Sequence, residues 1–188
     1  MSTSPVSGSA GAERYFFTQT MEAQFLKAFP ATDPALLAAY REAGFDVKRP
    51  LPAYEYAIWR RCLTVQRQHF FPALTVEEGC EQLGRQYSAN YLDTPIGRAV
   101  SVLLTVLSTR RIIDRLGRVF RSGNSFSVVT ATDEAPDAVR LDVNDVFSES
   151  PRYLVGMLER GFLVFRREVS LTPVRHEGDA ASFRVTWR

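Results

Sequence analysis

The chain has 188 residues, of which 45% are apolar and 12% aromatic, and its 23 basic side chains nearly balance 21 acidic ones. This size suffices to bury one substantial core, so we expect a single domain over residues 13–188. The balanced charge excludes a general attraction to nucleic acid or anionic lipid, and we expect neither a nucleic-acid partner nor membrane insertion.

The N-terminal segment Met1–Ala12 is rich in Ser, Gly and Ala and lacks the basic start and apolar run of a signal peptide. We therefore expect a flexible tail and a cytoplasmic protein. The longest apolar window, Ala99–Leu107, is far shorter than the roughly 20 residues that span a bilayer. Cys62 and Cys80 lack metal-ligand spacing, so we expect both to be reduced and buried.

The first elements of the chain are short. Tyr15–Phe17 is open to two interpretations, a strand or the start of a helix, because a brief aromatic run has no decisive period. Within Met21–Phe29 the large apolar residues recur every four positions, which is typical of a helix. Asp33-Pro34 then predicts the N-cap and first turn of a short helix that ends near Gly44.

Four further helices are predicted between Glu55 and Phe120. Glu55–Phe71 carries an apolar stripe at helical spacing, and Thr75–Tyr91 begins with the capping-box pair of Thr75 and Glu78. Thr94–Leu107 has the clearest amphipathic pattern in the chain. A last helix is predicted over Arg110–Phe120.

Past Gly123 the apolar period changes to two, which is typical of half-buried strands. Phe126–Ala131 and Val139–Asn144 predict a hairpin, Ser150–Phe165 a helix, and Val169–Trp187 a second hairpin. The order predicts an α+β fold, in which a helix-rich N-terminal half precedes a four- to five-stranded antiparallel sheet packed against helices.

Several short motifs resemble those of one protein family. They are Leu83-Gly84-Arg85, Gly97-Arg98-Ala99, the junction Arg118–Asn124, Tyr153-Leu154 with Gly156, and the closing Phe183–Trp187. On these motifs the chain, from about residue 15 to its end, resembles a myxobacterial paralogous family of uncharacterised proteins of about this size. The junction of that family usually continues with a second Asn and a Tyr, where this chain has Ser125 and Phe126.

The order of elements is also similar to that of haem-nitric-oxide-binding domains and 4-vinyl-reductase ligand-binding domains. Those relatives enclose haem, tetrapyrrole-like or other apolar ligands between helices and sheet, or act as adaptor surfaces. The resemblance implies a fold and transfers no site by itself. We expect no haem or other cofactor, because His69 and His176 are the only histidines and the Tyr-x-Ser-x-Arg signature of the haem-nitric-oxide domains is absent.

An apolar ligand pocket is predicted between the amphipathic helix and the apolar face of the sheet, although the many large aromatic residues could fill that space. The candidate pocket residues are Val100, Leu103, Leu104 and Leu107 on the helix, Val139, Leu141, Phe183 and Val185 on the sheet, and Asn124 at the junction.

A positive ridge of Arg111, Arg115 and Arg118, spaced four and three apart, is predicted on one helix. Such a ridge can contact phosphate or an acidic protein surface, and the alternative is a solvated face neutralised by nearby acids. No metal site is predicted, because the acidic residues between Asp142 and Asp145 lack the glycine and terminal glutamate of a calcium loop.

No nucleophile elbow, zinc-binding helix or phosphate-binding glycine loop is present in the sequence, so no enzymatic activity is predicted. The sequence favours a non-enzymatic small-molecule-binding or sensory domain of unknown ligand. The alternative is an adaptor or oligomerisation module that contacts a protein partner or a second copy of the chain.

Overall fold

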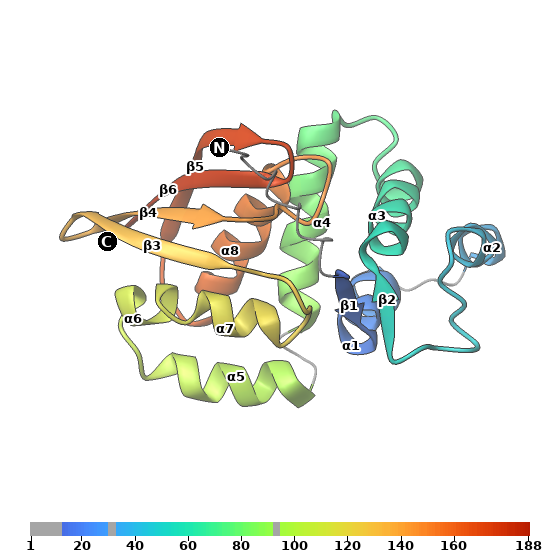
Figure 1. Cartoon of the computed structure of the whole chain (residues 1–188), viewed down its shortest axis with the longest axis horizontal. Helices are drawn as coiled ribbons and strands as arrows, with labels where there is room; N and C mark the ends of the chain where they lie inside the picture. The colour runs from blue at the N-terminus through green and yellow to red at the C-terminus, as the bar shows by residue number, and fades with distance from the viewer. Residues whose placement is uncertain (1–12, 30–32, 92–94) are drawn as a thin grey trace, which may run out of the picture.

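A computed structural model of the protein describes residues 13–29, 33–91 and 95–188. A four-stranded sheet lies in front of one long helix, and a second long helix stands beside the end of the sheet (Figure 1). Shorter helices lie along the lower edge of the sheet, and a helical N-terminal region lies beyond the second long helix. The tail predicted for Met1–Ala12 lies outside the described residues. None of the helices in the described ranges is long and apolar enough to cross a membrane.

The N-terminal region begins with a strand, which resolves the two interpretations of its aromatic run. Strand β1 (Tyr15–Phe17) pairs antiparallel with β2 (Ala53–Glu55), apart from the main sheet. Helix α1 (Thr18–Glu22) continues directly into the π-helical turn η1 (Ala23–Lys27). In α2 (Pro34–Glu42) the Asp33 carboxylate accepts a hydrogen bond from the amide of Ala35 at 2.9 Å, which confirms the predicted cap.

The middle helices follow their predicted start and stop signals. Helix α3 (Tyr56–Phe70) ends before Pro72, and α4 (Val76–Tyr91) begins with the reciprocal capping box. The Glu78 amide donates to the Thr75 hydroxyl at 3.3 Å, and the Thr75 amide donates to the Glu78 carboxylate at 3.0 Å. Helix α5 (Pro95–Thr105) is present, while the cap predicted at Thr94 lies outside the described residues.

The prediction of a single helix over Arg110–Phe120 is wrong. The segment forms two short helices, α6 (Thr109–Ile113) and α7 (Leu116–Arg121), separated by a turn. In that turn the Arg115 amide donates to the carbonyl three residues back, that of Ile112, rather than four back. Gly117 in the following turn costs about 1 kcal/mol relative to alanine in a helix, which weakens continuous helix formation at this position.

The main sheet contains the two predicted hairpins. Strands β3 (Val129–Ala135) and β4 (Ala138–Val143) form the first, β5 (Val169–Glu177) and β6 (Ala180–Trp187) the second, and the order is β3-β4-β6-β5, all antiparallel. The first strand begins at Val129 rather than at Phe126. The second hairpin turns at Gly178, whose φ of +58° suits a tight two-residue turn.

Helix α8 (Arg152–Val164) lies behind the sheet, where it packs against both β5 and α4. Helices α4 and α8 approach each other closely because each contributes a glycine to the contact. A Cβ atom added at Gly84 would fall well inside contact distance of the Tyr153 carbonyl oxygen, and one added at Gly156 would do the same at the Glu81 carbonyl oxygen. Only glycine permits this backbone approach.

The core extends from the sheet to the N-terminal region. Phe16 of β1 stacks on Trp59 of α3 with ring centroids 4.0 Å apart, and the indole N–H of Trp59 donates to the Phe147 carbonyl at 2.7 Å. Both cysteines are free and buried, as predicted. Residues far apart in sequence therefore meet where the N-terminal region contacts the segment that precedes α8.

Gly123 lies at the helix-to-strand junction, directly after the C-cap of α7. Among the described glycines, positive φ occurs at Gly44 and Gly178 and not at Gly123. Gly123 is instead constrained by Thr20, whose hydroxyl donates to the Gly123 carbonyl at 2.9 Å. A Cβ atom at Gly123 would lie 2.7 Å from the Thr20 Oγ1 atom, closer than real Cβ contacts allow.

Gly123→Val should therefore lower the free energy of unfolding by about 1–2 kcal/mol through local overpacking. Denaturant unfolding of the variant and the wild type measures this change. The second variant Thr20→Ala/Gly123→Val, in which the colliding hydroxyl is absent, should lose less stability than the sum of its single changes. Strict additivity would contradict the proposed contact.

Candidate ligand cavity

An apolar cavity of about 90 Å³ lies between α4, α5, α7, α8 and the start of the chain. Its wall is mainly aromatic and aliphatic. The larger lining side chains are Phe16, Trp59, Tyr87, Tyr91, Leu104, Ile112, Leu116, Phe120, Phe147, Tyr153, Met157, Leu158, Phe162 and Phe165. No strand of the main sheet contributes to this lining.

The polar groups around the cavity bond to the protein itself. The Ser88 hydroxyl donates to the Met157 carbonyl at 2.5 Å. The Asn124 amide nitrogen donates to the Phe120 carbonyl at 3.1 Å, and its oxygen accepts from the amides of Phe126 and Ser127 at 3.1 and 2.9 Å. Asn124 therefore lines the cavity, but its side-chain amide forms hydrogen bonds to the backbone of the helix-to-strand junction.

Three tyrosines, Tyr87, Tyr91 and Tyr153, line the cavity as neutral phenols. Burial raises the pKa of each of them above the usual value, so they stay protonated at neutral pH. The Tyr153 hydroxyl donates to the Gln24 side chain at 2.9 Å, and Gln24 donates to Gln66 at 2.6 Å. This buried chain of hydrogen bonds anchors α8 to the N-terminal region.

The structure places the predicted pocket residues in different locations. Val100, Leu104 and Asn124 line the cavity, whereas Leu103 is 69% exposed and lies with Leu107 along an outer groove. The cavity is not lined by the four predicted sheet residues, Val139, Leu141, Phe183 and Val185.

The predicted location of the pocket against the sheet therefore differs from the structure. Val139 pairs across the strands with Val185, and Leu141 pairs with Phe183, and all four side chains are buried. Helix α8 covers this face of the sheet (Figure 1), so the space beside α5 is bounded by helices instead. The apolar faces alone predicted that α5 packs against the sheet, whereas the space beside α5 is lined by α4, α7 and α8.

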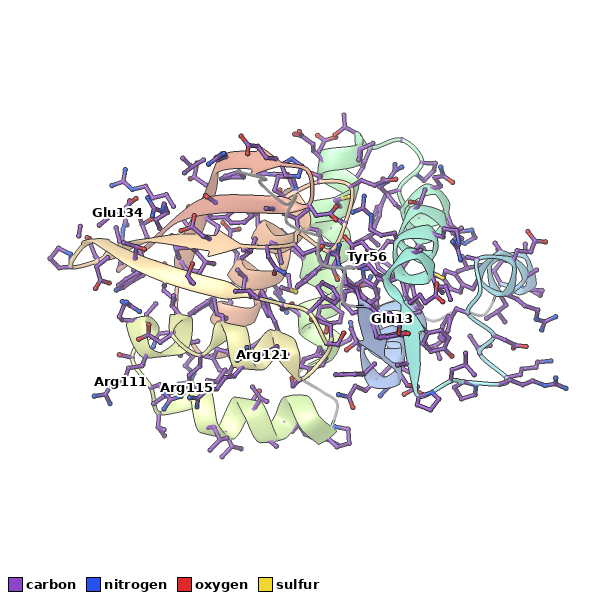
Figure 2. The ribbon with its side chains drawn as sticks, in the orientation of Figure 1. Glu13, Tyr56, Arg111, Arg115, Arg121 and Glu134 are labelled. Carbon is purple, nitrogen blue, oxygen red and sulfur yellow. The ribbon has the colours of Figure 1, made fainter. Side chains whose placement is uncertain are left out.

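The arginines of the predicted ridge are all exposed but do not share one helix. Arg111 lies on α6, Arg118 on α7, and Arg115 in the turn between them. Figure 2 shows Arg111 and Arg115 on the side of these helices that faces α5. Within the described residues these three arginines make no ion pair, while the neighbouring Arg110 pairs with Asp114 and, at 2.6 Å, with Asp133.

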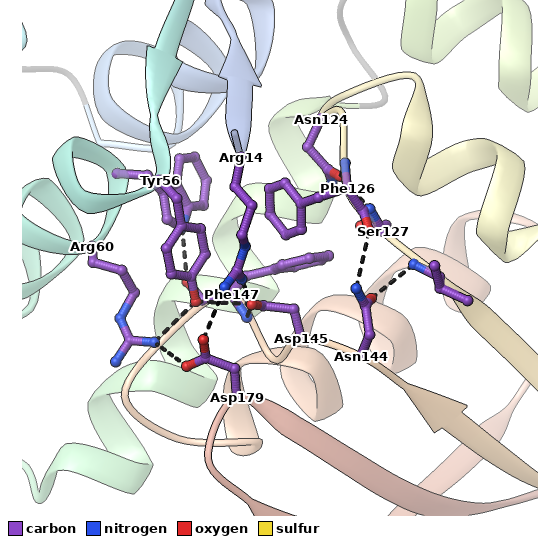
Figure 3. A network of polar contacts seen from close by, with 12 residues as sticks. Arg14, Tyr56, Arg60, Asn124, Phe126, Ser127, Asn144, Asp145, Phe147 and Asp179 are labelled. Carbon is purple, nitrogen blue, oxygen red and sulfur yellow. Dashed lines mark hydrogen bonds and ion pairs between the residues drawn. The ribbon is translucent and has the colours of Figure 1, made fainter. Parts of the chain in front are cut away.

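A buried polar network adjoins the cavity at Phe147 (Figure 3). The Asp145 carboxylate, with a side chain 0% exposed, forms an ion pair with Arg14 and accepts a hydrogen bond from the Tyr56 hydroxyl at 2.9 Å. The Arg14 guanidinium lies 3.8 Å from the centre of the Tyr56 ring and 4.5 Å from that of Phe126. Two ring faces and a carboxylate thus hold one cation.

Phe147 has a φ of +64°, which is strained for a residue other than glycine. Its amide donates to Asp145 at 2.6 Å, and its carbonyl accepts from Trp59 at 2.7 Å. These bonds hold the ring in the cavity wall. The sequence prediction missed the network, because Arg14 and Asp145 are 131 positions apart and no local pattern connects them.

No cluster of three or more His, Cys, Asp or Glu side chains suited to a metal ion occurs within residues 13–29, 33–91 and 95–188. The candidate site consists of the apolar cavity, the lining polar groups that hydrogen-bond to the protein, and the neighbouring groove between α5 and α7.

Comparison with solved structures confirms the resemblance of the fold to haem-nitric-oxide-binding (H-NOX) domains. A Cs H-NOX mutant carrying an unnatural amino acid superposes with a TM-score of 0.69 at 14% identity, over 92% of this chain and 96% of that one. An oxygen-binding H-NOX domain related to soluble guanylate cyclases gives 0.66 at 16% identity, over 91% and 95%. A T. Tengcongensis H-NOX mutant gives 0.65 at 15% identity, over 91% and 94%.

At these identities the likeness establishes the fold alone, which is the α+β arrangement predicted from the sequence. A comparison with curated proteins finds no match. A family profile described as "Protein of unknown function (DUF2378)" matches residues 14–188, which is nearly all of the described sequence. The chain therefore belongs to the DUF2378 family.

Proposed function

We propose that the protein is a non-catalytic sensory domain that binds an apolar small molecule in the cavity between α4, α5, α7 and α8. The observation that carries this proposal is the lining, in which polar atoms are satisfied by the protein and the remaining surface is aromatic or aliphatic. An apolar ligand that enters such a site removes its surface from water, and the site has few free polar groups that would favour a polar ligand instead.

Haem does not fit this cavity, although the similar structures include an H-NOX domain used to probe haem distortion and one in complex with oxygen. Its volume of about 90 Å³ is below even the ~150 Å³ cavity that accepts benzene. The described lining residues include neither His nor Cys, and the lining tyrosines are neutral phenols rather than phenolates. We therefore derive no function from haem.

Helix α5 is the wall best able to move when a ligand binds. Of its described side chains, Leu104 is buried and Val100 half-buried, whereas Val102 and Leu103 are 72% and 69% exposed. A helix with so few buried apolar contacts opens at low free-energy cost. Outward movement of α5 would enlarge the cavity for a ligand larger than its resting volume.

The second candidate function is an adaptor or oligomerisation module. It is favoured by the exposed apolar side chains of Val102 and Leu103 on α5 and of Val106 directly after the helix. Contiguous apolar surface of this kind is common at protein interfaces. Ligand binding and surface contact predict different results for substitutions on the two faces of this helix.

Leu104→Trp tests the two candidates, because Leu104 lines the cavity and a larger ring at this position should fill it. If the cavity binds ligands, decanol should raise the unfolding temperature of the wild type and leave that of the variant unchanged. A filled cavity should cost little stability, whereas a close-packed core would lose ~1–3 kcal/mol by overpacking.

Val102→Trp is the matched control, since it adds the same ring to the exposed face of α5. Stabilisation by decanol should persist in this control. Strong destabilisation by Leu104→Trp, together with no effect of decanol on the wild type, would contradict the ligand-binding proposal. Loss of self-association in Val102→Trp alone would instead support the adaptor.

A further inference from the structure

We propose that the ligand is a single-chain anionic amphiphile, such as a fatty acid, whose head lies at Arg115 and Arg118 and whose tail enters the cavity. This inference rests on the proposed ligand-binding function and adds the chemical class of the ligand. Its basis is a groove that adjoins the cavity on the outer side, between α5 and α7.

The groove has a volume of about 460 Å³, within the ~300–1,000 Å³ typical of small-molecule sites. Val100, Leu104 and Val119 line both the groove and the cavity, so these three aliphatic side chains form the wall between the two spaces. Val100 and Val119 are only half-buried. Rotation of side chains in this wall would connect the groove to the cavity without breaking a hydrogen bond.

The shape of the combined space suits a chain rather than a disc. The outer part is lined by apolar side chains that include Leu103 of α5 and Leu107 just after it, and the inner part is enclosed by aromatic residues. A flexible alkyl chain can pass a narrow wall of aliphatic side chains, whereas a rigid macrocycle cannot. The tail would be desolvated progressively from the groove inward.

The charge of the groove determines the head group. Arg115 and Arg118 line it, and neither forms an ion pair with any residue that the structure describes. None of the described residues that line the groove is acidic. Two guanidinium groups that the described residues leave without an ion pair lie beside an apolar groove and match a carboxylate, because arginine binds carboxylates through paired N–H donors.

The test compares decanoate with decanol by calorimetric titration of the full chain at low salt. Decanoate should bind about tenfold more tightly, as expected for charge-assisted hydrogen bonds that are partly exposed to solvent. Raising the salt concentration should reduce this preference. Affinity should increase about fourfold for each methylene added from octanoate to decanoate, which corresponds to about 0.8 kcal/mol per buried methylene.

Arg115→Gln/Arg118→Gln should remove the preference for decanoate while decanol binds as in the wild type. Arg111→Gln is the matched control, because Arg111 is exposed and does not line the groove. It should retain the full preference. A preference lost equally in the control would indicate a general charge effect and overturn the assignment of the head-group site.

Vesicles of phosphatidylcholine with and without phosphatidylserine distinguish a free amphiphile from a membrane surface. Binding to anionic vesicles through the two arginines, without binding of soluble decanoate, would overturn the proposal in favour of surface attachment. Equal binding of decanoate and decanol would overturn the head-group inference but leave the cavity function standing. Failure of both probes to bind would overturn the inference and the proposed function together.

Discussion

Gly84→Ala should destabilise the protein by about 3 kcal/mol or more, at the upper end of overpacking effects, because the added methyl group collides with main-chain atoms. The new Cβ atom would lie 2.9 Å from the Met157 amide nitrogen and closer still to the Tyr153 carbonyl oxygen. A side chain can rotate away from such a contact, but the backbone of α8 can only move as a unit. The helices would separate and open voids in the core on both sides.

Gly156→Ala should have a similar effect, since its Cβ would collide with the Glu81 carbonyl oxygen of α4. Gly117→Ala is the control: its Cβ would make ordinary contacts of 3.6 Å or more, and it should be neutral or gain up to ~1 kcal/mol from helix propensity. Denaturant unfolding measures all three. An unchanged midpoint for Gly84→Ala would show that α4 and α8 are not in backbone contact.

Arg14→Met should cost about 3 kcal/mol, the lower end of the range for breaking a buried ion pair, because Arg14 itself is partly exposed. The substitution leaves the Asp145 carboxylate buried with hydrogen-bond donors but without its cation. Methionine retains much of the apolar contact with the Tyr56 and Phe126 rings. The loss therefore reports mainly on charge.

Arg60→Met is the matched control, since Arg60 pairs with Asp179 at 3.3 Å between partly exposed side chains and should cost less than ~1 kcal/mol. In Arg14→Met/Asp145→Asn the unpaired charge is absent, so part of the stability should return. If Arg14→Met were no more destabilising than the control, the ion pair would contribute nothing specific to folding.

The sequence predicted those parts of the fold that depend on local physical chemistry. Asp33 and the pair Thr75 and Glu78 marked helix starts, because a side chain can satisfy an amide only at a fixed spacing. Alternating residues located both hairpins, and the order of elements indicated the α+β class. The break at Arg115 was missed, since the apolar period continues through it unchanged.

The candidate site was predicted only in part. Val100 and Leu104 follow from the amphipathic pattern of α5, whose apolar face must contact something. The pattern does not say what lies opposite, and the prediction chose the sheet where the structure has α4, α7 and α8. Phe16, Trp59 and Phe147 enter the wall through contacts between distant segments, and no periodicity in the sequence encodes such contacts.

The glycine contact between α4 and α8 also separates what can vary in this fold from what cannot. Positions 84 and 156 accept nothing larger than a hydrogen atom, so the spacing of the two helices is fixed by the main chain. Side chains such as Tyr87, Met157 and Phe162 project from that fixed frame into the cavity. Exchange of those side chains would change the capacity of the cavity while the frame stayed the same, so members of one family can share this architecture and differ in what they bind.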